Sequence, residues 1–355
     1  MDDLVSVVVV NYNGKHYLKD CIDSILSSAT AKYEIIIADN HSSDGSESHI
    51  QAAFPTQSGK IRFLALDKNY GPAKARNEGV KIAKGRYIAF LDNDTKVECN
   101  WLNKAIDLFR SDEKIGCIQC KLLLMDQKDR LDYAGEYLGH RGFLVQRAQH
   151  KEIDLGQYDQ EVEILAAKSA GMFIRKDVFK KIGGFDEDYF IYVEETDLGW
   201  RSWLLGFKTV FCPGSIVYHK FSTSSAILSK ERHDYNVRFH GAKNYITTLV
   251  KNLSFRNMVS ILPAHLCIWF IFTIFLIVTG NFRSAMYILK GASWVVINID
   301  RVIGKRVSIQ KGRVLSDEEI FIGHKLIKRG SILAKAKQYL TYSGPMLFRS
   351  VQGKA

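Results

Sequence analysis

The sequence has few cysteines, and their spacing excludes a structural zinc site. Of six cysteines in 355 residues, only Cys117 and Cys120 have CxxC spacing, and no second pair or nearby histidine completes a zinc set. The pair lies in the apolar stretch IGCIQCKLLL, so we expect core or surface residues rather than redox chemistry. We therefore predict reduced thiols and a cytosolic environment.

Three sequence features that are absent exclude or disfavour particular classes of protein. The N-terminus, MDDLVSVVVVNYNG, starts acidic and lacks the basic region and cleavage site of a signal peptide, so we expect no export. No GxGxxG motif follows Val10, which disfavours an NAD-dependent dehydrogenase. The next segment, NYNGKHYLKD, has too few glycines and basic residues for the phosphate loop of a sugar nucleotidyltransferase.

The composition is that of a folded, basic protein. Hydrophobic residues make up 46% and charged residues 25%, enough for a domain with a full core and a smaller appendage. Lys and Arg total 49 against 38 Asp and Glu, so the formal net charge is +11 and the partner should be anionic. The basic residues concentrate around an apolar segment and no stacking motif accompanies them, so we expect membrane lipids or phosphorylated substrates and no nucleic acid.

The first third alternates apolar runs with amphipathic stretches, which predicts a doubly wound α/β sheet. The apolar runs are continuous, as in strands that are buried on both faces. We expect strands at residues 5–10, 34–38, 61–66 and 87–91, and helices at residues 18–25 and 72–83. Asp92, Asn93 and Asp94 then lie at the carboxyl end of the fourth strand.

The pattern is more mixed from residue 101 to residue 225. We expect helices at residues 101–111 and 195–205, and strands at residues 115–124, 141–146, 164–174, 207–211 and 216–218. An amphipathic connecting helix is predicted at residues 231–252, within a connector of residues 226–258.

A sharp change in composition follows at residues 259–280, VSILPAHLCIWFIFTIFLIVTG. This stretch has the length that crosses a hydrocarbon core, and it favours a membrane segment over the alternative of a buried core helix. A second apolar stretch, residues 285–299, indicates the return leg of a hairpin or an interfacial helix. Both sides are basic, and these flanks contain Lys243, Lys251, Arg256, Arg301, Lys305, Arg306, Lys311 and Arg313.

The positive-inside rule places both basic flanks in the cytoplasm, whereas a single crossing would separate them. We therefore predict a membrane-embedded hairpin or half-buried anchor at residues 259–300, at the cell membrane, with the catalytic domain on the cytoplasmic face. Residues 301–355 are predicted to form a basic cytoplasmic tail for anionic headgroups or a pyrophosphate-linked lipid. A solvated face is the alternative explanation of this charge.

Two carboxylates one residue apart follow the fourth strand in the segment FLDNDT. Asp92 and Asp94 supply hard oxygen ligands where a loop opens, as in sites that hold Mg²⁺ or Mn²⁺ on a diphosphate. The same three residues would also form a turn or a helix cap. Two further polar loops, DNHSSDG from Asp39 and NYGPAKARNEG from Asn69, follow other strands and should reach the same edge of the sheet. That edge binds nucleotides in open α/β sheets, and Arg76 could contact a phosphate there.

A second acidic cluster lies in the segment FIYVEETDLGWR. Glu194, Glu195 and Asp197 sit at a predicted helix start, where acids also serve as caps. One of these carboxylates could take a proton from a substrate hydroxyl as a general base, and we predict Glu195 for this role. Further along, His219 in VYHKFSTSS could complete a metal site with Asp94.

The ordered motifs resemble the inverting glycosyltransferase family 2, with its GT-A fold, and particularly its rhamnosyltransferase-like branch. The resemblance covers residues 4–225 and rests on VVVVNYNG, DNHSSDG, NYGPAKARNEG, LDNDT, AGMFIRKDVFKKIGGFDE, YVEETDLGWR and YHKFSTS. It implies a Rossmann-like nucleotide-binding half and an acceptor half in residues 1–225. Family members usually carry Asp at the position of Glu195, which leaves Glu194 or Asp197 as substitute bases.

The resemblance also implies roles for individual residues. Asp94 and His219 would hold Mn²⁺ or Mg²⁺. The nucleotide sugar would be bound by Asn11, Tyr12, Asn13, Asp39, Arg76, Asp92 and Asn93. The acceptor side would contain Gly183, Gly184, Phe185, Asp186, Glu194 and Asp197.

The predicted function is metal-dependent, inverting transfer of a sugar from a nucleoside-diphosphate sugar to a hydroxyl of a lipid-linked or glycan acceptor at the membrane. Transfer would be a single displacement without a covalent enzyme intermediate. The alternative is a catalytically inactive, membrane-anchored subunit that binds sugar nucleotides or acts as a scaffold.

Overall fold

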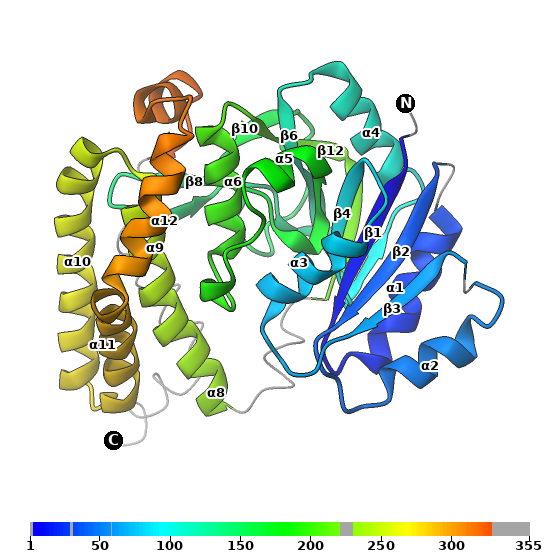
Figure 1. The fold of residues 1–355 in the computed structure, drawn as a ribbon, viewed down its shortest axis with the longest axis horizontal. Coiled ribbons are helices and arrows are strands. Elements are labelled where there is room, and N and C mark those ends of the chain that lie inside the picture. Colours follow the sequence, from blue (N-terminus) through cyan, green and yellow to red (C-terminus); the bar gives the residue numbers. More distant parts are fainter. Residues whose placement is uncertain (1–2, 29–30, 58, 221–229, 329–355) are drawn as a thin grey trace.

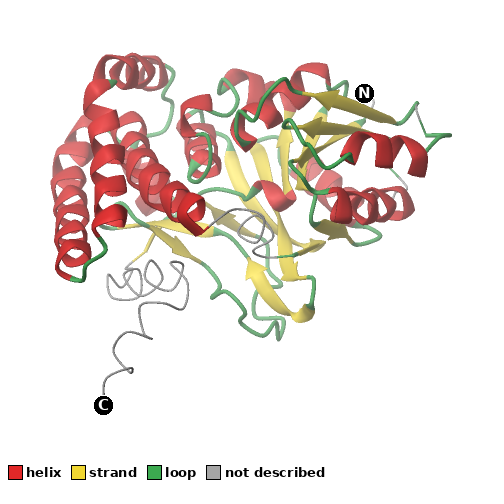
Figure 2. Cartoon of the chain, turned by 90° about the horizontal axis from the view of Figure 1, so that it is seen from below, coloured by secondary structure: helices red, strands yellow, loops and turns green. Residues whose placement is uncertain are grey.

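The fold consists of a mixed α/β domain and a group of C-terminal helices at one end of it (Figure 1). The structure is a computed structural model that describes all residues except 1–2, 29–30, 58, 221–229 and 329–355. Among the described residues, the main sheet has ten strands, with a central path ordered β10-β12-β6-β11-β4-β1-β2-β3. The C-terminal helices lie at the opposite end of the molecule from β3 and α2 (Figures 1 and 2).

The N-terminal half of the sheet is parallel, as predicted. It contains β1 (Val5–Asn11), β2 (Tyr33–Asp39), β3 (Ile61–Ala65) and β4 (Tyr87–Asp92), connected by α1 (Lys15–Ser28), α2 (Ser46–Ala53) and α3 (Pro72–Ile82). Every residue of β1 is buried. Val7 and Val9 belong to the core on the α1 side, and Val8 and Val10 belong to the core on the α3 side. Apolar residues on both faces thus explain the continuous valine run.

The C-terminal half of the sheet begins where β11 pairs antiparallel with β4. Its elements are β5 (Thr95–Val97), α4 (Trp101–Ser111), β6 (Ile115–Leu124), β7 (Gln127–Tyr133), β10 (Val162–Ile164), β11 (Met172–Arg175), α5 (Lys176–Lys181), α6 (Glu194–Leu204) and β12 (Lys208–His219). A smaller sheet is formed by β8 (Glu136–Gly139), β9 (Leu144–Gln146) and β13 (Ile327–Lys328). Cys117 and Cys120 are buried, free thiols in β6, so the predicted structural role is confirmed.

Two predicted strand boundaries are wrong. The strand expected at residues 164–174 is two strands, β10 and β11, with a 3-10 turn at Ser169–Gly171 before β11. The two short strands expected at residues 207–211 and 216–218 are one strand, β12, whose register shifts between Cys212 and Ile216. The Pro and Gly in this stretch therefore mark a bulge and not a turn.

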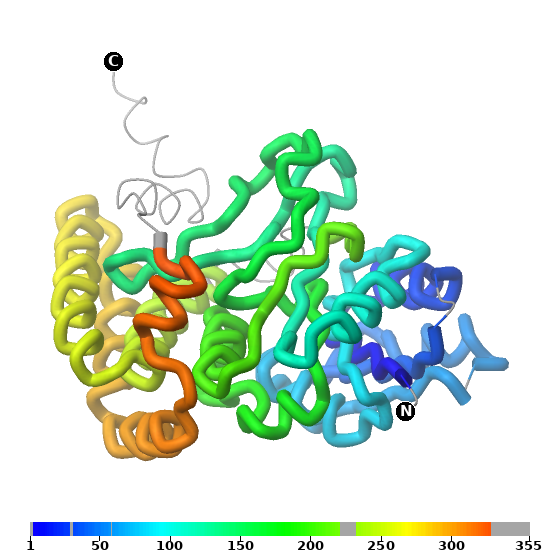
Figure 3. The backbone as a smooth tube through the Cα atoms, turned by 90° about the horizontal axis from the view of Figure 1, so that it is seen from above, coloured from blue at the N-terminus to red at the C-terminus, as the bar shows by residue number. Residues whose placement is uncertain are grey.

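The C-terminal helices begin with α8 (Lys230–Tyr235) and a π-helical turn at Asn236–His240. They continue through α9 (Gly241–Asn252), α10 (Phe255–Val278), α11 (Phe282–Ile297) and α12 (Ile299–Lys311). Every residue of α9 is buried. The helix predicted at residues 231–252 is present as α8, the π-helical turn and α9, and α9 is buried because α6, α10, α11 and α12 pack on it. The connector role of residues 226–258 stays a prediction. The tube in Figure 3 follows the chain from the N-terminal strands, through the middle of the sheet, to these helices.

The apolar stretches expected at residues 259–280 and 285–299 correspond to α10 and α11, which lie side by side (Figure 1). Gly280, which has a positive φ of 75°, lies in the short connection between them. By length and composition alone, α10 could cross a membrane, and only 22% of its most apolar window is buried. Phe270, Ile271 and Val278 are 64%, 65% and 80% exposed.

Several cations of the predicted basic flanks face the protein. Lys251 is 1% exposed and pairs with Asp186, and Lys305 pairs with Asp188 at 2.5 Å. Arg306 donates to backbone carbonyls of α9 and Leu253. Lys251 is therefore too buried to contribute to a basic surface, and Lys305 and Arg306 are held by partners within the protein. Residues 329–355 of the predicted tail lie outside the described residues.

Candidate active site

The carboxyl ends of β1, β2 and β4 carry polar side chains that contact one another. Asn11 Nδ2 donates to Asp39 Oδ1 at 2.7 Å, and Asn93 Nδ2 donates to Asn11 Oδ1 at 2.7 Å. Parallel pairing aligns these strand ends, because Asn11 is in register with Asp39, and Val10 with Asp92. The predicted convergence is thus present for the ends of β2 and β4. The loop after β3 joins them, because Asn40 Nδ2 donates to Asn69 Oδ1 at 2.8 Å.

The loop after β2 is held by its own polar side chains. The Asp39 carboxylate accepts from the Ser42 hydroxyl at 2.6 Å and from the Ser42 amide at 2.8 Å. Asn13 Oδ1 accepts from the Ser43 amide at 2.8 Å, and Tyr12 and Asn13 are partly exposed. The loops after β1 and β2 therefore form one connected wall beside the strand ends.

Asp92, Asp94 and His219 form the candidate metal centre. One ligand atom from each of the three lies within 4.8 Å of the others. His219 Nε2 is 3.5 Å from Asp94 Oδ1, and antiparallel pairing of β5 with β12 sets His219 opposite Thr95. Two carboxylates and an imidazole fit Mn²⁺ and are also compatible with Mg²⁺. Asp94 and His219 are near enough to share an ion.

Asp132 orients His219, and the sequence did not single it out. Its Oδ2 is 2.8 Å from His219 Nδ1, and its Oδ1 is 3.2 Å from His150 Nδ1. Burial disfavours the imidazolium, but hydrogen bonds to Asp132 and Asp94 outweigh it and raise the pKa of His219 well above its usual value. A carboxylate on Nδ1 leaves Nε2 as the nitrogen that faces Asp94. No local motif marks Asp132, because β6 brings β7 and β12 together.

Arg76 is buried among three carboxylates. Its guanidinium donates to Glu194 Oε1 at 3.0 Å and to Asp92 Oδ1 at 3.1 Å, and Glu195 Oε1 is 4.0 Å away. Burial and the charge of Glu195 raise the pKa of Glu194 to about 7, although Arg76 opposes this shift. Arg76 therefore connects the metal-side acids with the acids of α6, and the predicted contact with phosphate stays a prediction.

The three acids at the start of α6 have different surroundings. The Glu195 side chain is 21% exposed, and its Oε1 accepts from the Ser169 amide at 2.7 Å and from the Ser169 hydroxyl. Glu194 is 4% exposed. Asp197 is fully buried and pairs with Arg201 at 2.8 Å and Lys251 at 3.0 Å. Of these three, Glu195 has the most open carboxylate.

Four of the predicted acceptor-side residues lie in the turn after α5, namely Gly183, Gly184, Phe185 and Asp186, whereas Glu194 and Asp197 lie at the start of α6. Gly183 and Gly184 have φ values of 81° and 69°, which favour glycine. Phe185 is 2% exposed and its ring lies 5.5 Å from the Arg76 guanidinium. Burial disfavours the Asp186 carboxylate, but Lys251 and Lys305 outweigh this and lower its pKa. Asp186 is thus an internal ion-pair partner, and its role toward an acceptor stays a prediction.

The protein contains a mixed α/β domain with acidic side chains at the carboxyl ends of its parallel strands. In open α/β sheets this edge is where nucleotides bind. The model of glycosyl transferase family 2 matches residues 6–183, half of the chain, and the chain belongs to this family. It therefore carries a glycosyltransferase domain.

Relatives and a solved structure agree with this assignment. Glycosyltransferase GlyG of Streptococcus pneumoniae serotype 4 is 39% identical over 102 residues, 29% of this chain and 34% of that protein. The UDP-Glc:alpha-D-GlcNAc-diphosphoundecaprenol beta-1,3-glucosyltransferase WfgD of Escherichia coli is 35% identical over 109 residues, 30% of this chain and 42% of that protein. The alignments thus span less than half of either relative.

The similarity of fold extends further along the chain. The mannosyltransferase PcManGT from Pyrobaculum calidifontis, solved in complex with GDP-Man and Mn²⁺, has a TM-score of 0.52 and 13% identity. The superposition covers 99% of this chain and 88% of that chain. The expected GT-A-like fold is therefore confirmed.

Proposed function

We propose that the chain is a metal-dependent, inverting glycosyltransferase that moves a sugar from a nucleoside-diphosphate sugar to a hydroxyl of a membrane-associated acceptor. The observation that carries the proposal is the convergence of Asp92, Asp94 and His219 at the nucleotide-type edge, with Glu195 beyond Arg76. The fold shared with a mannosyltransferase solved with GDP-Man and Mn²⁺ supports both donor class and metal. The motif order supports the rhamnosyltransferase-like branch.

Asp94 and His219 are the residues that would hold Mn²⁺ or Mg²⁺, with Asp92 beside them. When bound, such an ion offsets the negative charge of the departing diphosphate. Asn11, Tyr12, Asn13, Asp39 and Asn93 would bind the nucleotide and its sugar. Asp132 holds the His219 ring in place.

Glu195 would act as the general base. The acceptor oxygen forms its bond to the anomeric carbon as the bond to the diphosphate oxygen breaks, and the hydroxyl proton passes to the Glu195 carboxylate. Attack from the face opposite the leaving group inverts the anomeric centre. The Ser169 amide and hydroxyl fix one carboxylate oxygen and support this role. The substitutes Glu194 and Asp197 are less suited, because their carboxylates are buried against cations.

A membrane-associated acceptor is supported by two observations. The α10–α11 pair exposes large apolar side chains, and WfgD is named for transfer to a diphosphoundecaprenol-linked sugar. We propose that this pair enters the cytoplasmic face of the cell membrane as a hairpin or half-buried anchor. The acceptor would then be a lipid-linked or growing glycan.

Transfer by the purified full-length chain tests the proposal. With Mn²⁺ and a lipid-linked acceptor, we expect one member of a nucleotide-sugar panel to release nucleoside diphosphate. Glu195→Gln should lower kcat by about 10²-fold or more with donor binding retained, since it removes the base. Asp94→Ala should weaken metal-dependent nucleotide binding. Asp23→Asn, a surface change on α1, should leave both unchanged.

Two outcomes would contradict the proposed glycosyltransferase activity. If no donor is consumed and Asp94→Ala binds nucleotide as the wild type does, neither transfer nor a metal-linked site remains. Metal-dependent nucleotide binding without any transfer would instead favour the inactive binding or scaffold subunit.

A further inference from the structure

The segment that leads into α6 has an unusual backbone. Phe190, Tyr192 and Val193 have φ values of 61°, 68° and 65°, although none is glycine. The backbone of a residue with a side chain rarely adopts this left-handed region, and a β-branched residue such as Val193 is especially disfavoured there. Such strained conformations persist only where surrounding contacts hold them.

The segment begins with a tight turn and ends at the catalytic helix. The Ile191 amide donates to the Tyr189 carbonyl at 2.7 Å, and Phe190 has φ 61° and ψ −68°, which is the rare and strained form of the γ-turn. Val193 directly precedes Glu194, the first residue of α6. The direction of the backbone at Val193 therefore determines where Glu194 and Glu195 lie.

Asn244 of α9 holds this segment from the C-terminal side. Its Nδ2 donates to the carbonyls of Tyr189, Ile191 and Tyr192 at 3.0, 2.8 and 2.7 Å. Asn244 is fully buried, and because carbonyl oxygens only accept hydrogen bonds, the amide group must face them with its nitrogen. One side chain thus contacts three carbonyls within four residues.

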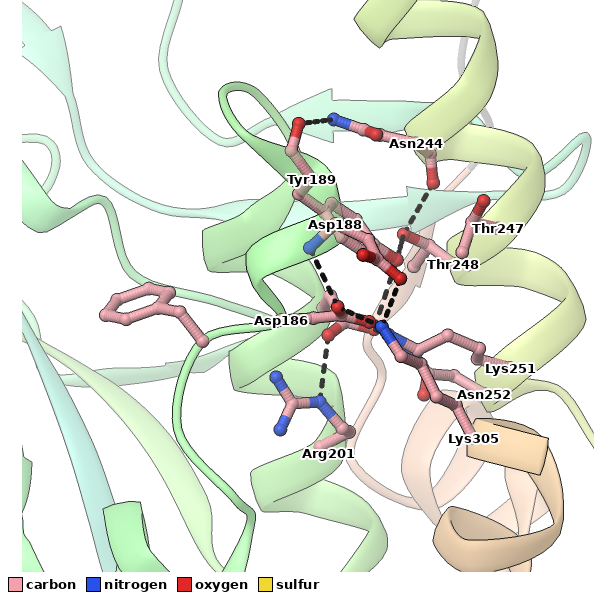
Figure 4. A network of polar contacts seen from close by, with 12 residues as sticks. Asp186, Asp188, Tyr189, Arg201, Asn244, Thr247, Thr248, Lys251, Asn252 and Lys305 are labelled. Carbon is pink, nitrogen blue, oxygen red and sulfur yellow. Dashed lines mark hydrogen bonds and ion pairs between the residues drawn. The ribbon is translucent and has the colours of Figure 1, made fainter. Parts of the chain in front are cut away.

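Cations of α9 and α12 hold the residues just before the turn (Figure 4). Lys251 pairs with Asp186 at 2.5 Å, and Lys305 pairs with both Asp186 and Asp188. The Tyr189 hydroxyl lies 2.7 Å from the Thr248 hydroxyl. Contacts from the C-terminal helices therefore extend from Asp186 to Tyr192.

We propose that Asn244 is a positioning residue for the catalytic carboxylates. It stabilises the strained turn at residues 189–193 and so sets the start of α6, with Glu194 beside Arg76 and Glu195 beside Ser169. Without its three hydrogen bonds, the turn would relax toward negative φ and displace the start of α6. The consequence for catalysis rests on the proposed function, whereas the effect on the turn does not.

The test compares Asn244→Ala with Thr247→Val in the full-length chain. Thr247 is a matched control, because it is buried in the same helix and, among the described residues, its hydroxyl donates only to the Lys243 carbonyl of that helix. For Asn244→Ala we expect faster amide hydrogen exchange at residues 189–197 and at least a tenfold loss in kcat. The donor KM and the Mn²⁺ affinity should stay within about twofold, because the metal centre is untouched. Thr247→Val should match the wild type in all four.

The proposal would be overturned if Asn244→Ala had the same amide hydrogen exchange and the same kcat as the wild type. Equal losses in kcat and Mn²⁺ affinity would also overturn it, because they would indicate general damage to the fold. If Asn244→Ala does not fold, Asn244→Ser replaces it, with the same measurements and smaller expected changes. If the wild type transfers no sugar, the proposed function fails, but hydrogen exchange still decides whether Asn244 holds the turn.

Discussion

Asp132 contacts the ring nitrogen of His219 that faces away from Asp94. Buried carboxylates on metal-binding histidines fix the ring and its tautomer, and their loss commonly lowers metal affinity 10- to 100-fold. Both oxygens of Asp132 lie near histidine nitrogens, and the residue is 3% exposed. Its contribution should therefore be measurable without any sugar transfer.

We expect Asp132→Asn to weaken Mn²⁺ binding by about 10-fold or more, because the amide lacks the charge that orients and supports the imidazole. Titration calorimetry or Mn²⁺ paramagnetic resonance in the absence of donor would measure this. Asp129→Asn, on the exposed part of the same strand, is the control and should bind Mn²⁺ normally. Equal affinity in the two variants would exclude a role for Asp132 in the metal centre.

At this scale, sequence reasoning located residues that follow strands and missed those that do not. Asp39 and Asp92 were predictable because parallel strands end at one edge, and Asn11 was implied by the family resemblance. Asp132 and Ser169 were not, because their partners His219 and Glu195 reach them only through pairing between distant strands and packing of α6. The surroundings of Arg76 were also hidden, since two of its three carboxylates come from the later part of the chain.

At the scale of elements, α6 packs unusually close to another stretch of backbone. A Cβ on Gly199 would lie 2.6 Å from the Ala166 Cβ and 2.8 Å from the Leu165 carbonyl oxygen. Glycine normally weakens a helix interior by about 1 kcal/mol relative to alanine. At this position glycine allows the helix that carries Glu194 and Glu195 to pack closely against the backbone at residues 165–166.

Gly199→Ala should therefore destabilise the protein by about 1–3 kcal/mol through overpacking, as measured by denaturant unfolding. Gly304→Ala is a matched change in α12, where an added Cβ meets no atom within 4 Å among the described residues. That variant should gain up to about 1 kcal/mol. If both substitutions changed the free energy of unfolding in the same direction, close packing would not be the reason for glycine at position 199.

The helices and strands of the first third could be predicted because their apolar periodicity is regular and turn residues separate them. Prediction failed where one signal has two physical meanings. Two separate strands were expected on either side of the Pro and Gly of β12, which mark a bulge within one strand. The amphipathic pattern of α9 predicted a solvent-exposed face. Lys243, Asn244 and Lys251 instead have partners in the segment 186–192, which local sequence cannot reveal.

At the scale of the whole molecule, the apolar surface is concentrated on α10 and α11. Because these side chains are exposed, replacing them should change membrane binding and leave the fold intact. We expect the full-length chain to sediment with vesicles that contain anionic lipid, and the double variant Phe270→Asp/Ile271→Asp to remain in solution. Leu155→Asp, which alters a side chain that is 84% exposed on the α/β domain, should still sediment.

Vesicle binding by the double variant, or its absence in the wild type, would contradict the proposed membrane contact. Thermal unfolding of all three proteins serves as the check on folding. Point substitutions are preferable to removal of residues 259–355, because removal would also delete Lys305 and expose the buried surface of α9.

The burial of α9 separates two definitions of the catalytic unit. The match to the family ends at residue 183, and the predicted domain ends at residue 225. The side-chain amide that donates to the carbonyls just before α6 belongs to Asn244. A shortened protein that retains all the recognisable motifs would thus lack the side chain that we propose to position Glu195. On this proposal, activity requires residues well beyond the last recognisable motif.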